Sequence, residues 1–136
     1  MLNYIIYLLF LGNDGKTDLS TCERFDARIR KWDTIASMST KRSDCGVVVA
    51  RNSVYVIGGH DGREALTSVE RYDARMNVWE HMAPLSTKRR YFGCGIVGDY
   101  VFVCGGNDGS SILSSTERYN VRLNKWEVVT PMPGNR

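Results

Sequence analysis

The stretch GGHDGREALTSVERYDARMNVW, from Gly58 to Trp79, decides the fold because closely similar stretches occur twice more in the chain. One ends 47 residues earlier at Trp32, and the other ends 47 residues later at Trp126. No insertion or deletion interrupts this register. Self-similarity at a fixed period of roughly 20 to 50 residues is typical of repeat architectures. The sequence therefore predicts stacked copies of one structural unit.

Each 47-residue period is predicted to form four short strands. Gly46 to Ala50 and Val54 to Ile57 are apolar, β-branched runs, and the polar residues between them suit a tight hairpin. Ser68 to Asp73 and Val78 to Met82 form a second pair across the turn at residues 74–77. No pattern indicates a helix longer than one turn. Because a four-stranded unit cannot bury both of its faces alone, we expect the units to stack as in a radial propeller.

Paired glycines support this architecture. Gly58-Gly59 and Gly105-Gly106 end the second strand of their units, where adjacent blades approach the axis. Only glycine combines a close backbone approach with freedom at positive φ. In the first unit Leu11 replaces the first glycine, and Tyr7 to Leu11 is predicted to be a buried strand.

The paired glycines, the Glu-Arg-Tyr-Asp segment at residues 70–73 and Trp79 resemble the kelch repeat, and the resemblance covers nearly the whole chain. The segment Met38-Ser39-Thr40-Lys41-Arg42 is similar to kelch-like adaptors that carry BTB and BACK domains ahead of their propeller. The resemblance implies an all-β partial kelch β-propeller. We expect two complete four-stranded antiparallel blades at residues 39–85 and 86–136, and an incomplete N-terminal blade at residues 1–38 that lacks its first strand.

The same resemblance implies a protein-protein interaction module. We expect the substrate-recognition part of an adaptor of a cullin-RING E3 ubiquitin ligase, which binds a short peptide degron. Cullin would be reached only through BTB and BACK domains, which are absent from this chain. The alternative is an actin-binding or other cytoskeletal scaffold. Upstream sequence would separate the two, because BTB and BACK domains favour the ligase.

In kelch-like propellers the partner lies across one face, on the loops after the paired glycines and on the segments that lead into each first strand. The resemblance places these candidate peptide-binding residues there: Ser43, Asp44, His60, Asp61, Arg63, Arg90, Tyr91, Asn107 and Ser110. Arg90 and Tyr91 are the strongest candidates, because a guanidinium grips a carboxylate in a fork and both residue types are enriched at binding hot spots. Asp14, Asp61 and Asp108 also suit tight Asx turns, which would occupy their carboxylates.

Other recurrent residues are predicted to be structural. Arg42 and Arg89 occupy one repeat position, and Glu23, Glu70 and Glu117 occupy another, so we expect pairing inside or between blades. The three tryptophans, with Tyr72 and Tyr119, are predicted to be packing anchors of the blades.

Composition narrows the class of partner. The 136 residues are 43% hydrophobic and 24% charged, which is typical of one soluble domain, and the net charge of +3 is too small to indicate nucleic acid or a membrane as a partner. Cys22, Cys45, Cys94 and Cys104 form no C-x-x-C pair, so free thiols in the reducing cytoplasm are expected. The apolar start also resembles part of a signal peptide, but the strand at residues 7–11 explains it.

We predict no catalysis and no cofactor. A kelch-type copper oxidase would need metal ligands at related positions, whereas His60 and His81 fall at unrelated ones. The sequence contains no G-x-S-x-G elbow, no P-loop and no dinucleotide fingerprint. Cys94 and Cys104 lie in apolar strands, where a thiol is usually inert packing.

Overall fold

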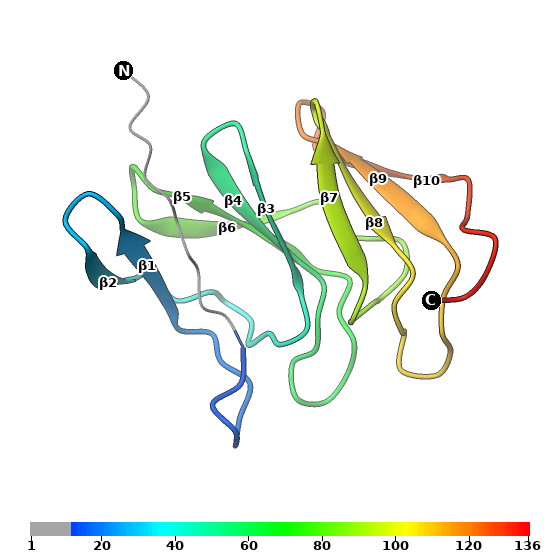
Figure 1. Ribbon diagram of the computed structural model, residues 1–136, viewed down its shortest axis with the longest axis horizontal. Helices are drawn as coiled ribbons and strands as arrows, with labels where there is room; N and C mark the ends of the chain where they lie inside the picture. The colour runs from blue at the N-terminus through cyan, green and yellow to red at the C-terminus, as the bar shows by residue number, and fades with distance from the viewer. Residues whose placement is uncertain (1–11) are drawn as a thin grey trace.

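The computed structural model describes residues 12–136, which form three antiparallel β-sheets and no helix (Figure 1). The first sheet pairs β1 (Cys22–Asp26) with β2 (Lys31–Ile35). The second contains β3 (Gly46–Ala50), β4 (Ser53–Ile57), β5 (Val69–Asp73) and β6 (Val78–Met82). The third contains β7 (Gly93–Val97), β8 (Tyr100–Cys104), β9 (Thr116–Asn120) and β10 (Lys125–Val129). Two four-stranded blades and a partial one confirm the predicted fold class.

Within each four-stranded blade every strand pairs with its neighbour in sequence. The turn between β3 and β4 has Arg51 and Asn52 at positive φ, the backbone of a tight hairpin whose twist matches its strands. The strand predicted at Tyr7 to Leu11 lies outside the described residues. None of the described segments forms a long apolar helix of the kind that could cross a membrane.

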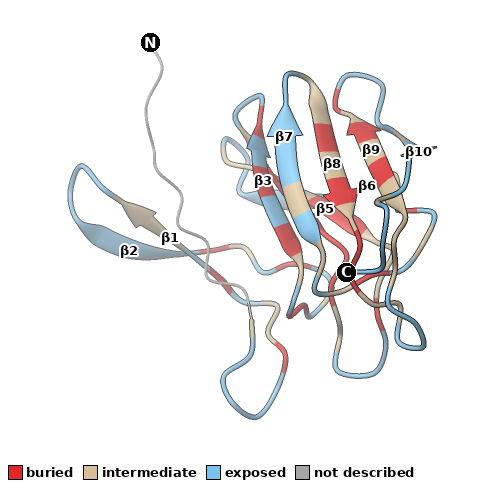
Figure 2. Cartoon of the chain, turned by 45° about the vertical axis from the view of Figure 1, so that its right-hand side comes forward, coloured by how far each residue is buried: buried red, intermediate tan, exposed pale blue. Residues whose placement is uncertain are grey.

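The apolar core lies between the blades. One cluster joins the first unit to the second and contains Cys22, Ile35, Val54, Val56 and Tyr72. A second cluster joins the second blade to the third, with Tyr55 and Ile57 packed near Val101, Val103 and Tyr119. Figure 2 shows this as buried bands that alternate with exposed ones along β3. Stacking therefore buries the strand faces that a single blade would leave in water.

In each complete blade a tryptophan forms a hydrogen bond to the unit before it. The Trp79 indole N–H donates to the carbonyl oxygen of Ala36 at 2.7 Å, and Trp126 donates to Ala83 at 2.8 Å. The predicted role as packing anchors is thus confirmed for Trp79 and Trp126, which are partly buried. Trp32 forms a tilted ring pair with Phe25 and is 46% exposed.

A buried ion pair holds each linker to the blade that follows it. Arg42 and Glu70 are buried and their Nη2 and Oε2 atoms lie 3.0 Å apart, while Arg89 and Glu117 are paired at 2.9 Å. Arg42 also donates to the carbonyl oxygens of Gly58 and Ser68. The predicted pairing is thus confirmed for the two complete blades. It was wrong for Glu23, which is exposed and forms no ion pair with another residue of 12–136.

The paired glycines let the linker and the loop approach each other. Gly58 and Gly59 both have positive φ, and a Cβ at Gly59 would lie 2.5 Å from the Ser43 carbonyl oxygen. This close approach holds the linker and the loop after β4 together, and the candidate site lies between them.

Candidate functional site

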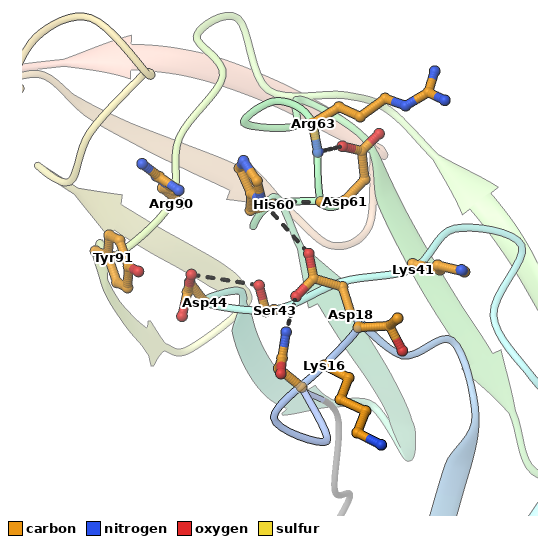
Figure 3. Close-up of a pocket in the computed structure, with 13 residues that line it drawn as sticks. Lys16, Asp18, Lys41, Ser43, Asp44, His60, Asp61, Arg63, Arg90 and Tyr91 are labelled. Atoms are coloured by element: carbon orange, nitrogen blue, oxygen red, sulfur yellow. Dashed lines mark hydrogen bonds and ion pairs between the residues drawn. The ribbon is translucent and has the colours of Figure 1, made fainter.

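A polar pocket of about 680 Å³ lies where loops from three units meet (Figure 3). Its walls are the loop before β1, the linker before β3, the loop after β4 and the linker before β7. The lining residues are Asn13, Lys16, Thr17, Asp18, Lys41, Ser43, Asp44, His60, Asp61, Gly62, Arg63, Arg90 and Tyr91. Seven of the nine candidate residues lie here, whereas Asn107 and Ser110 belong to the loop after β8 and do not line it.

Aspartate turns give two of these loops their shape. The Asp61 carboxylate accepts hydrogen bonds from the backbone N–H groups of Arg63 and Glu64 at 2.8 and 2.9 Å. Asp14 accepts in the same way from Lys16 and Thr17. These backbone donors lower the pKa of both carboxyl groups, so the anionic form is retained. The predicted Asx turns are confirmed, and the Asp61 carboxylate is already hydrogen-bonded to the backbone of its own loop.

The floor of the pocket contains Asp18, which is buried. Its Oδ1 accepts from the Asn13 amide at 2.9 Å, and its Oδ2 lies 3.5 Å from Nδ1 of His60. The Asn13 hydrogen bond outweighs the effect of burial and lowers the pKa of Asp18. Backbone bonds of 2.9 Å in both directions join Ser43 to His60 and fix the floor.

Asp18, His60 and Ser43 do not form a nucleophilic triad. The Gly62 N–H donates to Nδ1 of His60 at 3.1 Å, and the 3.5 Å between this nitrogen and Oδ2 of Asp18 is longer than an ordinary hydrogen bond. The Ser43 hydroxyl donates toward Asp44 at 3.4 Å rather than to the imidazole of His60. A serine nucleophile needs a base within hydrogen-bond reach, and the arrangement instead provides a polar floor.

Asp44, Arg90 and Tyr91 form one wall of the pocket. Asp44 and Tyr91 occupy the same repeat position, and both have positive φ, a strained conformation that clusters at binding sites. The Tyr91 ring is 65% exposed, and its bond to Asp44 raises the pKa of the phenol. The Arg90 guanidinium lies 5.2 Å from the centre of that ring. Its Nε is buried and has no hydrogen-bond partner within the described part of the chain.

The acidic side chains of the pocket already have hydrogen-bond partners within the chain, whereas three basic side chains at its rim have no ion-pair partner among the described residues. Its three carboxylates already accept hydrogen bonds within the chain, as described above. Lys16, Lys41 and Arg63 extend outward from the rim in Figure 3, and none of them forms an ion pair with another described residue. The unpaired charges that remain for a ligand are therefore positive.

Asp18 and Lys41 were not among the predicted site residues. Asp18 stands where the other units have Ala65 and Ile112, so it is the polar exception in an apolar repeat position. Comparing the three units position by position could have found it. Lys41 is followed one period later by Lys88, and such a recurrence gives no sign that only one copy faces a pocket.

The cysteines are predicted to react slowly. Burial raises the pKa of Cys22 and Cys45 to about 11 and that of Cys94 to about 12. At pH 8 a disulfide reagent should modify these thiols at least about 100-fold more slowly in the folded chain than in guanidinium, because thiolate is the nucleophile. The Cys104→Ser variant isolates these three for the measurement. A rapid phase in that folded variant would contradict the prediction.

The comparisons with known proteins agree with the geometry. A family model described as the Kelch motif matches residues 41–86 and 88–133. Kelch-like protein 13 of Mus musculus is 40% identical over 50 residues, which are 37% of this chain and 8% of that protein. Kelch repeat-containing protein kel-10 of Caenorhabditis elegans is 42% identical over 48 residues, or 35% of this chain and 8% of that protein. The chain thus matches only a small part of each of these relatives.

Proposed function

The chain belongs to the kelch-repeat family, which forms protein-interaction modules, and from that premise we propose that its pocket binds a short acidic peptide. The observation that carries this proposal is Arg90, whose buried Nε lacks a partner while its guanidinium lies beside the exposed Tyr91 ring. A peptide carboxylate would accept from the outer nitrogens of this guanidinium, and the ring offers a flat apolar contact.

Charge supports an acidic ligand over a basic one. A basic peptide would have to share Asp18, Asp44 and Asp61 with donors that these carboxylates already accept within the chain, and the bonds to Asp18 and Asp61 help to shape the pocket. An acidic peptide would leave these bonds intact and meet Lys16, Lys41 and Arg63 at the rim. Such rim charges mainly raise the association rate, whereas a desolvated contact at Arg90 would slow dissociation.

We further propose that this peptide is a degron, and that the chain is the substrate-recognition part of a cullin-RING E3 ubiquitin ligase adaptor. The support is the similarity to kelch-like proteins, together with a Caenorhabditis elegans relative whose name includes a BTB domain. Cullin would be contacted by BTB and BACK domains outside these kelch units. The proposal places the protein in the cytoplasm, where its thiols stay reduced.

The Arg90→Ala variant tests the peptide site. It should weaken binding of acidic peptides about 30-fold, because losing one partner of a desolvated charged hydrogen bond costs about 2 kcal/mol. The probe is a fluorescent library of acidic peptides, each compared with its amide counterpart, titrated against the whole chain. Arg75→Ala is the matched control, since Arg75 is exposed on the turn between β5 and β6.

Equal affinity of the parent and Arg90→Ala chains for every acidic peptide that binds would overturn the proposed site. Co-sedimentation with filamentous actin that is independent of Arg90 would instead favour a cytoskeletal scaffold.

A further inference from the structure

The hairpin turns at the end of the blades away from the pocket repeat one pattern. In Figure 1 the β1–β2, β5–β6 and β9–β10 turns lie toward the upper end of the molecule, whereas the loops before β1, after β4 and after β8 lie at the lower end. In each of these turns an arginine precedes an exposed apolar residue: Arg28-Ile29, Arg75-Met76 and Arg122-Leu123. With the β3–β4 and β7–β8 turns they form what we call the turn face, residues 26–31, 51–52, 73–78, 98–99 and 120–125.

The backbone of each of these three turns is fixed by hydrogen bonds within the chain. Asp73 accepts from the N–H groups of Arg75 and Met76 at 2.9 and 3.3 Å. Asn77 follows at positive φ, and its side chain accepts from the Ala36 N–H at 2.9 Å. Equivalent bonds hold the turn of the third blade. The turn therefore uses the backbone of its apolar residue and leaves the side chain free.

The apolar side chains of the three turns have no packing role among residues 12–136. Met76 is the clearest case, because a described unit lies on each side of its blade and the side chain is still 71% exposed. Ile29 is 59% exposed and Leu123 is 70% exposed, and none of the three belongs to a core cluster. A single exposed apolar residue is ordinary. Its recurrence at one position of all three units indicates a contact outside the chain.

The positive charge of the chain is concentrated on the turn face. This face has seven basic and three acidic residues, a net charge of +4, whereas the whole chain has +3. The rest of the chain is therefore slightly acidic, and the small total conceals a basic face. Asp26 and Asp99 are paired with arginines, and Asp73 accepts from backbone. The cations of this face that form no ion pair with another residue of 12–136 are Arg30, Lys31, Arg75 and Lys125.

An anionic lipid surface satisfies both features together. Its headgroups attract arginine and lysine, and the boundary with the acyl chains takes up apolar side chains. A nucleic acid would meet the cations but would leave three apolar side chains in water. A protein partner would need a separate matching hollow for each turn, whereas a lipid surface offers the same chemistry at every point. Identical turns on three units therefore fit a lipid surface best.

We propose that the turn face binds anionic lipid bilayers. Ile29, Met76 and Leu123 enter the headgroup region, and the cations beside them contact the charged groups of the lipids. The pocket faces away from the bilayer and stays open, because its loops lie at the other end of the blades. Neither the ligand of the pocket nor any role in ubiquitination enters this inference.

Co-sedimentation of the whole chain with lipid vesicles tests the proposal. The parent should bind vesicles made of equal parts phosphatidylserine and phosphatidylcholine, bind pure phosphatidylcholine weakly, and lose affinity as salt is added. A triple variant, Ile29→Ser with Met76→Ser and Leu123→Ser, keeps every charge and should bind at least about 10-fold more weakly, because it loses the apolar contacts. Ile112→Ser is the control, since Ile112 is 57% exposed on the loop after β8 and this variant should bind as the parent does.

A second pair of variants separates the location of the charge from its total. Replacing Arg30, Arg75 and Lys125 with Gln should also weaken binding at least about 10-fold. Replacing Lys16, Lys41 and Arg63 with Gln removes the same total charge from the pocket end and should leave vesicle binding unchanged. All of these residues are exposed, and circular dichroism confirms that each variant is folded.

Three results would each overturn the proposal. The first is a folded parent that does not bind the anionic vesicles. The second is equal weakening by the two charge variants, since total charge would then explain the binding. The third is an apolar triple variant that binds as tightly as the parent. A parent that binds polyglutamate through Arg75 but ignores vesicles would assign the turn face to an acidic protein instead.

Discussion

The Arg42→Met variant should lower the free energy of unfolding by about 3 to 5 kcal/mol, because removing one partner of a buried ion pair leaves an uncompensated charge. Here that charge is Glu70, which is buried, and the carbonyl oxygens of Gly58 and Ser68 lose their donor at the same time. Urea denaturation at pH 7 measures the loss. Lys41→Ala is the control, since Lys41 is the exposed neighbour and surface changes usually stay within about 0.5 kcal/mol.

The pH dependence of this loss separates lost charge pairing from lost packing. In the parent, burial raises the pKa of Glu70, but hydrogen bonds from Ser39 and Arg42 outweigh it and the pKa is lowered. A lowered carboxyl pKa stabilises the fold above the unfolded-state pKa, and this contribution is lost as the pH falls through the folded-state pKa. Without Arg42, protonation of Glu70 would relieve the buried charge. The deficit of the variant should therefore shrink between pH 7 and about pH 4; a deficit that grows on acidification would contradict this account.

The repeat period predicted the local structure well. Hairpin turns, aspartate turns and buried arginines depend on residues close in sequence or on contacts that recur with each unit, so a fixed period reveals them. Asp61 and Asp108 illustrate this, because each accepts from two backbone N–H groups within three residues. A local carboxylate and a following glycine are enough to specify such a turn.

Burial at equivalent positions was harder to predict. Glu23 and Trp32 carry the same residue types as Glu70 and Trp79, but their exposure differs because burial depends on whether another unit lies against them. A repeat identifies which side chains can be buried. Which of them are buried depends on contacts between units, which no single period contains.

Part of the candidate site could be predicted from the repeat, and part of it could not. Arg90 and Tyr91 could be named from the sequence because they follow a recurrent arginine at the start of a blade. The pocket itself depends on Asp18, a departure from the repeat that joins Asn13 to His60 across two units. Since such a contact is made once, the period could not predict it, and Asn107 and Ser110 lie outside the pocket despite their equivalent sequence positions.

The Trp79→Ala variant should destabilise the chain by about 3 kcal/mol, the lower end of the range for truncating a buried aromatic side chain. Its indole donates to Ala36, its ring lies 5.1 Å from that of Tyr72, and both pack in the cluster between the first and second units. The variant thus loses a hydrogen bond and apolar contacts at the same interface. Trp32→Ala is the matched control at the same repeat position, and its 46% exposed ring should cost about half as much or less. Denaturant midpoints of both variants decide the matter, since equal losses would show that the contact with the preceding unit adds nothing to the anchoring by Trp79.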